Sequence, residues 1–234
     1  MSKLKKTIYN NEQVSKVVVP IYHKLKRTRN FSSKNYWERR YAKQGNSGAG
    51  SYGRLAQFKA DVLNEFARKN SIKTVLEFGS GDGAQLGLFN FKNYIGFDVS
   101  PTSIRLCAKK FASDKTKSFF LYEPDCFFDN HNVFSADLTL SLDVIYHLVE
   151  DEVFDKYMRD LFAASNKYVI IYASNMIDDK LSRAQHVRHR KFSDWVKKNA
   201  KGWKLDKKLD NQFKLKADQI DESFADFYIY KKAK

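Results

Sequence analysis

Cysteine, proline and long apolar runs are scarce in this 234-residue sequence, and each scarcity excludes a class of protein. The two cysteines, Cys107 and Cys126, are too few for a disulfide framework, so a reducing compartment is the default. The apolar run at residues 17–21 is far too short to cross a bilayer. Residues 1–16 contain no apolar segment typical of a secretory signal, and we therefore expect a cytoplasmic protein.

Glycine is also sparse, but it is unevenly placed. Seven of the ten glycines lie between Gly45 and Gly83, in a loop at residues 45–53 and in a second cluster at residues 79–83. Glycine lets the backbone take positive φ or approach a ligand closely. This clustering is the first indication of a binding site.

Acidic side chains are outnumbered, because 27 Asp and Glu oppose 42 Lys and Arg and leave a formal net charge of +15. A basic surface attracts nucleic acid, an anionic membrane or phosphorylated sugars, although solubility alone also explains such a charge. Eight of the basic residues precede residue 31, with one acidic residue, Glu12. We predict a basic arm at residues 1–35, which contacts an anionic membrane or polyanion or is a solvated leader. Residues 36–234 have the length of one domain.

Helical and strand patterns alternate along residues 36–234. Apolar residues at steps of three and four predict helices, and short apolar runs between turn residues predict strands. The predicted helices span residues 54–69, 84–90, 100–111 and 151–164, after a helical turn at 35–41. The predicted strands span residues 73–78, 94–98, 118–122, 136–142, 168–173, 203–209 and 224–230, the last as an edge or antiparallel strand. This order predicts an α/β fold with a parallel sheet covered on both faces.

The most informative motif follows the first predicted strand. Glu77 stands near the end of that strand, and Gly79, Gly81 and Gly83 follow, so three alternate positions have no side chain. A ligand then lies against the backbone, in space that a Cβ atom would occupy. A dinucleotide-binding fingerprint would place the third glycine one residue later. Asp98 ends the next strand, where a carboxylate can accept both hydroxyls of a ribose.

Three segments in order carry a family resemblance: residues 77–83, 96–100 and 141–148, which read EFGSGDG, GFDVS and SLDVIYHL. They resemble motifs I and II and the segment after the fourth strand in class I S-adenosylmethionine-dependent methyltransferases, the last as found in small-molecule methyltransferases. The segments YWERRY at 36–41 and SGAGSYG at 47–53 resemble bacterial methyltransferases associated with surface polysaccharides. The resemblance implies a Rossmann-like, mostly parallel seven-stranded sheet with helices on both faces and an antiparallel C-terminal strand. It also implies S-adenosyl-L-methionine as the cofactor.

The same resemblance implies roles for individual residues. Glu77 is expected to orient the methionyl amine, and Asp98 to hold the ribose hydroxyls. Asp125 is expected to accept from the adenine amino group, with the Cys126 amide on a ring nitrogen. The glycine-rich loop is expected to close over the cofactor and to pair Arg54 with its carboxylate, although a solvated helix start explains Arg54 equally well. The expected cofactor-binding set is Tyr52, Arg54, Glu77, Gly79, Gly81, Gly83, Asp98, Val99, Asp125, Cys126 and Leu142.

His147 follows the fourth predicted strand, at the edge where open α/β sheets bind ligands. Its ordinary pKa of about 6.5 suits a general base, although a lone histidine is often structural. Asp143 is a second catalytic candidate, or it orients His147. Tyr146 stands where many relatives carry Glu, so acceptor analogies with those relatives do not transfer.

Residues 186–191 form a basic cluster, HVRHRK, after the fifth predicted strand. Arginine and histidine together suit a phosphate or carboxylate on the acceptor, and a basic surface loop is the alternative. No cysteine or third histidine lies near enough in sequence to suggest a zinc site, and no metal is expected. The expected acceptor-binding residues are Tyr146, His186, Arg188, His189 and Arg190.

Three functions remain open. The first is O-methylation of a small molecule or saccharide, with a phosphorylated or acidic glycan precursor of bacterial surface polysaccharide as the expected acceptor. The second is methylation of RNA, favoured by the net charge, or N-methylation of a small amine. The Asn/Asp-Pro-Pro-Tyr signature of base N-methylation is absent, since residues 141–144 read SLDV. The third is a cofactor-binding scaffold without activity, which the intact set from Glu77 to Asp98 disfavours.

Overall fold

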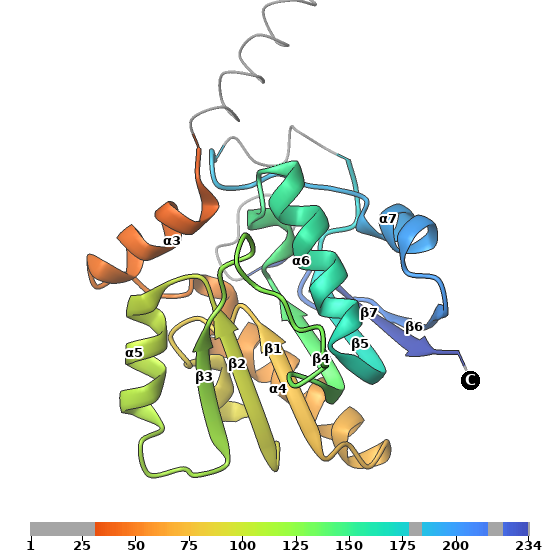
Figure 1. Ribbon diagram of the computed structural model, residues 1–234, viewed down its shortest axis with the longest axis horizontal. Coiled ribbons are helices and arrows are strands. Elements are labelled where there is room, and N and C mark those ends of the chain that lie inside the picture. The colour runs from red at the N-terminus through yellow and green to blue at the C-terminus, as the bar shows by residue number, and fades with distance from the viewer. Residues whose placement is uncertain (1–30, 178–183, 215–221, 234) are drawn as a thin grey trace, which may run out of the picture.

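A computed structural model describes residues 31–177, 184–214 and 222–233 of the chain. The described part is a twisted open sheet with helices packed on it (Figure 1). Residues 1–30 of the predicted basic arm lie outside the described residues, and so does the expected contact of that arm with a membrane or polyanion. Within the described ranges, no helix is both long and apolar enough to cross a membrane.

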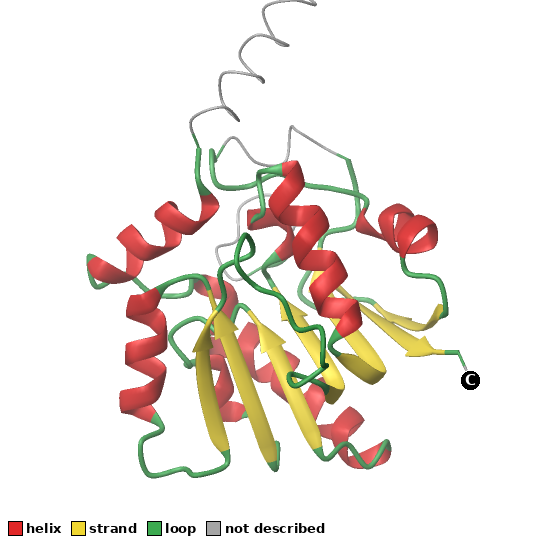
Figure 2. Cartoon of the chain, viewed as in Figure 1, coloured by secondary structure: helices red, strands yellow, loops and turns green. Residues whose placement is uncertain are grey.

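The described strands form one seven-stranded sheet in the order β3-β2-β1-β4-β5-β7-β6 (Figure 2). The strands are β1 Thr74–Phe78, β2 Asn93–Asp98, β3 Lys117–Leu121, β4 Ala136–Leu142, β5 Ser165–Ala173, β6 Trp203–Leu209 and β7 Asp226–Lys232. Strands β1 to β5 pair in parallel, whereas β7 pairs antiparallel with both β5 and β6. The predicted parallel sheet and antiparallel C-terminal strand are confirmed.

Helices α4 and α6 cover opposite faces of the sheet (Figure 1). The α-helices in the described part are α3 Ser33–Ala42, α4 Gly53–Lys69, α5 Pro101–Lys110, α6 Asp151–Ala163 and α7 Phe192–Asn199. Short 3-10 turns lie at η1 Ala49–Ser51, η2 Gln85–Leu88 and η3 Ile145–His147. Leu63 of α4 and Leu161 of α6 are fully buried against the two faces, and burying such a side chain contributes about 1.5–3 kcal/mol.

Side-chain caps set the start of two helices near the site. The Ser100 hydroxyl accepts a hydrogen bond from the Ser103 amide, and Pro101 takes the first helical position of α5. Ser32 caps α3 in the same way, by accepting from the Asn35 amide. Each cap is worth about 1 kcal/mol and fixes where the helix leaves the preceding loop.

The structure differs from the predicted elements at three points. The helix predicted at residues 84–90 is only the turn η2, because the glycines at 83 and 87 disfavour a longer helix. Helix α7 was not predicted, although Phe192 and Val196 are buried four residues apart on one of its faces. Helix α3 begins at Ser33, two residues before the predicted helical turn at 35–41, and runs across the boundary predicted after residue 35.

The strand order reverses between β1 and β4, because β2 and β3 extend to one side of β1 while β4 and β5 extend to the other. At such a point the carboxyl ends of the strands leave a crevice in which open α/β sheets bind ligands. Glu77, Asp98 and Leu142 lie at or next to the ends of β1, β2 and β4. The topology therefore brings these three residues to one edge of the sheet.

Candidate functional site

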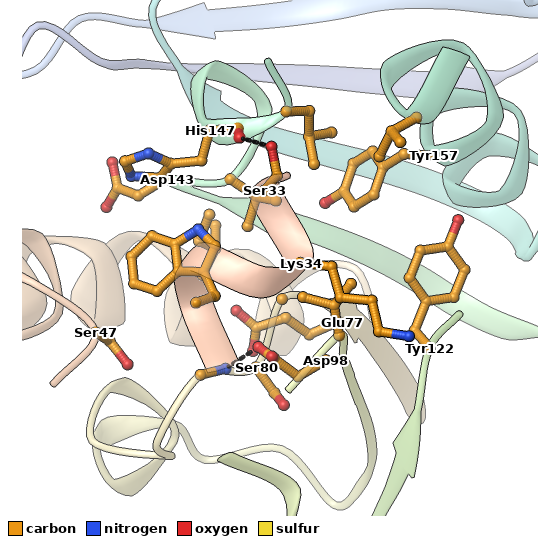
Figure 3. A pocket seen from close by; sticks show the side chains of 18 of the residues that line it. Ser33, Lys34, Ser47, Glu77, Ser80, Asp98, Tyr122, Asp143, His147 and Tyr157 are labelled. Carbon is orange, nitrogen blue, oxygen red and sulfur yellow. Dashed lines mark hydrogen bonds between the residues drawn. The ribbon is translucent and has the colours of Figure 1, made fainter. Parts of the chain in front are cut away.

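A cavity of about 280 Å³ lies at the carboxyl ends of β1, β2 and β4, with α3 residues over it (Figure 3). This volume lies just below the range of about 300–1,000 Å³ that is usual for small-molecule sites. Six acidic side chains and two lysines line it: Glu77, Asp82, Asp98, Asp125, Asp143, Glu150, Lys34 and Lys59. The chain as a whole carries a net charge of +15, so the acidic excess of this lining is local and suits a ligand with positive charge.

The glycine-rich turn after β1 forms one wall. Gly79 and Gly81 take positive φ of 89° and 59°, and both line the cavity. A Cβ atom at Gly79 would lie 2.4 Å from Val144, and one at Gly81 would lie 2.4 Å from the Ser47 hydroxyl. Backbone conformation and neighbouring protein segments therefore require these glycines, and ligand space alone is not the reason, contrary to the sequence-based expectation. Gly83 packs against α5 and does not line the cavity.

Asp98 is held at the cavity wall by the backbone. Its Oδ2 accepts from the Gly81 amide and its Oδ1 accepts from the Ser100 amide, both at 2.9 Å. Burial raises the pKa of Asp98, and the two amide hydrogen bonds oppose that rise. Each carboxylate oxygen can accept a second hydrogen bond. Asp98 is therefore fixed in place and keeps capacity for two further donors.

Glu77 is 4% exposed and accepts a 2.6 Å hydrogen bond from the Tyr94 hydroxyl. Burial raises the pKa of Glu77 to about 7, and the Tyr94 hydrogen bond and the nearby Lys59 ammonium counter that rise. A cationic ligand group beside Glu77 would favour its charged form. This carboxyl is therefore poised to respond to a bound ammonium.

Helix α3 is attached to the loops around the cavity. The Ser33 amide and hydroxyl donate to the two oxygens of Glu150, at 2.8 and 2.5 Å. Lys34 pairs with Glu123, which follows β3, at 2.5 Å. Glu38 accepts three hydrogen bonds from the start of α5. Ser33 and Lys34 both line the cavity, and the Ser33 hydroxyl lies 2.7 Å from the His147 carbonyl oxygen (Figure 3).

Asp143 follows β4 and has a left-handed backbone, with φ of 60°. Its Oδ2 accepts from the Lys59 ammonium at 2.6 Å, and its Oδ1 accepts from the Tyr146 hydroxyl at 2.8 Å. The Lys59 side chain is 1% exposed, so this is a buried ion pair. Tyr146 was expected to bind the acceptor, but it supports Asp143 and does not line the cavity.

His147 lines the cavity, and its Nδ1 lies 2.8 Å from the backbone carbonyl oxygen of His186. A carbonyl oxygen only accepts, so we place the proton on Nδ1 and the lone pair on Nε2. Trp37 packs edge-on against the imidazole, with ring centroids 4.9 Å apart. Burial lowers the pKa of His147 to about 4, so the ring is neutral at physiological pH. The His186 carbonyl, and not the Asp143 carboxylate, makes the hydrogen bond that orients the ring.

The expected cofactor residues divide into two groups. Those that line the cavity are Glu77, Gly79, Gly81, Asp98, Val99, Asp125 and Leu142. Tyr52 lies outside the lining but donates a 2.7 Å hydrogen bond to Asp82, which is part of it. Arg54 stacks 4.8 Å over the Phe213 ring and does not line the cavity. The Cys126 amide donates to a carbonyl within its own turn and is likewise outside the lining.

The side chains of the basic segment at residues 186–190, after β5, contact other parts of the protein. Arg188 and Arg190 both pair with Asp151 at 2.9 Å and donate to backbone carbonyls that follow η3. His189 is buried, with Nδ1 2.7 Å from a serine hydroxyl after β5. His186 stacks on a tyrosine ring of α3. None of these four side chains lines the cavity. The two arginines bind neighbouring segments, and the two histidine rings pack against other rings.

Lys59 and Gln85 are among the lining residues that were not predicted from the sequence. The signal for Lys59 was its place on the apolar face of a predicted helix, four residues after Leu55 and three before Val62, where a lysine needs a partner. Gln85 donates to a backbone carbonyl of α4, and its Oε1 has no hydrogen-bond partner among the described residues. The same holds for Ser80 Oγ. Both residues are 7% exposed and line the cavity, so a ligand would complete their hydrogen bonding.

The described residues contain no group of three or more His, Cys, Asp and Glu side chains placed to hold a metal ion. The polar groups of the cavity are instead joined pairwise, as in the Lys59–Asp143 and Tyr94–Glu77 contacts.

Comparison of the sequence with protein-family models and with curated proteins gives no match. Comparison of the structure with solved structures gives several. The methyltransferase domain of a bacterial CtHen1 is 19% identical with a TM-score of 0.60, and the match covers 77% of this chain and all of that one. N-methyltransferase NodS from Bradyrhizobium japonicum WM9, in complex with S-adenosyl-L-homocysteine, is 14% identical with a TM-score of 0.60 over 77% and 88% of the two chains.

Magnesium protoporphyrin IX methyltransferase from Synechocystis PCC 6803, with bound S-adenosylhomocysteine, is 13% identical with a TM-score of 0.57. That match covers 76% of this chain and 83% of the other. At sequence identities this low, a structural likeness shows a shared fold and not a shared activity. Together with the strand order and the antiparallel β7, these likenesses show that the chain has the fold of class I S-adenosylmethionine-dependent methyltransferases.

Proposed function

We propose that this chain is a methyltransferase that uses S-adenosyl-L-methionine. The observation that carries the proposal is the pair of buried carboxyls, Glu77 and Asp98, at the ends of neighbouring strands in one cavity. The cofactor has a sulfonium and an ammonium against one carboxylate, so the acidic excess of the lining complements its net positive charge. The unsatisfied oxygens of Ser80 and Gln85 are further groups that a polar ligand would satisfy.

The described residues fit the cofactor in three places. Asp98 has two lone pairs left for the ribose hydroxyls after binding the backbone amides of its own wall. Glu77 would accept from the methionyl ammonium, which would stabilise its charged form. Asp125 and Val99 lie along the side of the cavity formed after β2 and β3, where the adenine would rest.

The cofactor would supply a methyl group on a good leaving group, a sulfonium that departs as a neutral thioether. The protein then has two tasks, to align the acceptor and to exclude water. An acceptor hydroxyl must also lose its proton, and we propose that the Nε2 lone pair of neutral His147 accepts it, because His147 lines the cavity and its Nδ1 is bonded to the His186 carbonyl. Trp37 and the His186 carbonyl hold the imidazole in that orientation.

We propose a small molecule or saccharide with a free hydroxyl as the acceptor. His147 supports this choice, because an unprotonated amine would not need a base beside it. The two lysines of the lining give no support for a phosphate or carboxylate on the acceptor, since Lys34 pairs with Glu123, and Lys59 pairs with Asp143 and lies near Glu77 on the cofactor side. We therefore propose that an anionic group of a glycan acceptor binds outside this cavity. For RNA methylation, the supporting observation is the net charge of +15.

Isothermal titration calorimetry with S-adenosylhomocysteine tests the cofactor. We expect micromolar binding by the wild type and a loss of about a hundredfold or more in Asp98→Ala, because the ribose loses both acceptor oxygens. Asp206→Ala, a change on the exposed edge strand β6, is the matched control and should bind as the wild type does. Absence of heat in the wild type, or equal binding by Asp98→Ala, would refute the proposal.

Consumption of the methyl donor tests the acceptor. Nucleotide sugars, neutral saccharides, phosphorylated sugars, small amines and RNA should be compared under one set of conditions. We expect turnover with hydroxyl-bearing small molecules. Turnover with RNA alone, steeply reduced by salt, would replace the proposed acceptor with the nucleic-acid alternative.

A further inference from the structure

Lys59 is an unusual residue for the interior of this protein. Its side chain is 1% exposed, it sits on the apolar face of α4, and it lines the cavity. Burying an ammonium is costly unless charges and hydrogen bonds compensate it. A leucine or methionine would fill this position on an amphipathic helix without that cost.

The surroundings of Lys59 compensate its charge but leave hydrogen-bonding capacity. An ammonium has three donors, and among the described residues its one hydrogen-bond acceptor is Asp143, at 2.6 Å. The Tyr172 ring lies 5.3 Å from Nζ and adds a cation–π contact. Two donors of a buried ammonium at the cavity wall therefore await an acceptor.

Acceptor groups that await donors lie in the same cavity. Gln85 uses its Nε2 to bind the carbonyl of Ala56, one turn before Lys59 on α4, and its Oε1 has no partner in the described structure. Glu77 is close enough to Lys59 for the ammonium to lower its pKa. Unused donors and unused acceptors thus lie together at the cavity wall, as a zwitterionic ligand group would require.

The free donors of Lys59 specify the ligand group further. A ligand with a sulfonium and an ammonium but no carboxylate would leave these two donors without an acceptor. The cluster therefore matches an amino acid end that keeps its carboxylate.

We propose that Lys59 donates to the methionyl carboxylate of the cofactor, while Glu77 and Gln85 Oε1 accept from its ammonium. This inference rests on the proposed function and assigns to Lys59 the role expected from the sequence for Arg54, which lies outside the lining. Lys59 is then the residue that distinguishes the complete cofactor from analogues without a carboxylate.

Two ligands test the assignment, S-adenosylhomocysteine and its decarboxylated analogue S-adenosyl-3-thiopropylamine, which lacks only the carboxylate. Calorimetry should show that the wild type prefers S-adenosylhomocysteine by about tenfold to a hundredfold, the usual worth of a charged hydrogen bond. Lys59→Met should lose this preference, by weakening the binding of S-adenosylhomocysteine and not that of the analogue. Arg54→Met, a matched loss of a cation on the same helix, should retain the preference.

Lys59→Met leaves Asp143 without its counter-charge, which could unfold the protein. A second variant therefore separates an effect on ligand binding from an effect on folding. The double variant Lys59→Met/Asp143→Asn removes both charges and should show the same loss of preference. Circular dichroism and thermal unfolding confirm that each variant is folded.

Three results would overturn the assignment: no preference in the wild type, equal weakening of both ligands in the Lys59 variants, or loss of preference in Arg54→Met. Failure of the wild type to bind either ligand would instead contradict the proposed function.

Discussion

The cavity lining and the segment at residues 186–190 both contain clustered charges, yet they differ in how those charges are used. The guanidinium groups of Arg188 and Arg190 donate hydrogen bonds to Asp151 and to backbone carbonyls. Asp98 and Lys59 are also bonded within the protein, but each keeps capacity for further hydrogen bonds at the cavity wall. A charge cluster in a sequence thus indicates a site only when the fold leaves part of its bonding capacity unused.

The largest expected difference between the two regions concerns catalysis. His147→Ala should lower the rate of methyl transfer to a hydroxyl acceptor by about 10²-fold, the lower end of what a general base contributes, because burial lowers the pKa of this base to about 4. Methyl-donor consumption with the acceptor found by the screen measures this. Because burial lowers the pKa of His147 to about 4, the wild-type rate should show no inflection from this residue between pH 6 and 8. An unchanged rate in His147→Ala would remove His147 as the base.

Stability should respond to pH through the cavity lining. The pKa of Glu77 rises from 4.5 to about 7 on folding, so its contribution is fully present below pH 4.5 and is lost as pH rises through 7. Between pH 5 and 8 the ligand-free wild type should therefore lose on the order of 3 kcal/mol relative to Glu77→Gln. Urea unfolding of both proteins at several pH values measures the difference. If the free energies of unfolding of the two proteins changed with pH in parallel, folding would not raise the pKa of Glu77.

The basic segment should matter for folding and not for the ligand. Arg190→Met should destabilise the protein by about 2 kcal/mol, because a charged donor to two backbone carbonyls and to Asp151 is lost. Affinity for S-adenosylhomocysteine should stay within about twofold when measured well below the unfolding temperature. A large loss of affinity in a folded Arg190→Met protein would erase the distinction between the two regions.

The smallest effect is expected at the border of the cavity. Tyr52 is 40% exposed and contributes one hydrogen bond to Asp82. Tyr52→Phe should lower stability by less than about 1 kcal/mol and affinity for S-adenosylhomocysteine by less than about threefold. Calorimetry of the two proteins side by side provides the comparison, and a tenfold loss would place the Tyr52 hydroxyl in direct contact with the ligand.

Much of the fold could be predicted from the sequence, because its signals are local. The period of the apolar residues marked α4, the Ser100-Pro101 pair marked the start of α5, and the most apolar run marked β5. Helix α7 escaped prediction because its pattern covers only two turns. The length of η2 was overestimated because Leu86 and Phe89 are buried there without a helix.

The site was only partly predictable, and the reason is physical. Glu77 and Asp98 belong to strand ends, so topology alone brings them together. Lys59 and Gln85 reach the cavity through the packing of α4 and η2. The apolar helix face showed that Lys59 needs a partner, but no local pattern identified Asp143 as that partner or placed Gln85 at the cavity. The partners of Arg188 and Arg190 lie more than thirty residues earlier in the chain, so their structural role was invisible in sequence.

A crystal structure of the protein grown with S-adenosylhomocysteine tests the central claim most directly. We predict density in the cavity at the ends of β1, β2 and β4, with the ribose hydroxyls on Asp98 and the amino acid end between Glu77 and Lys59. An empty cavity in crystals soaked at saturating ligand, or a ligand bound elsewhere on the chain, would contradict the account.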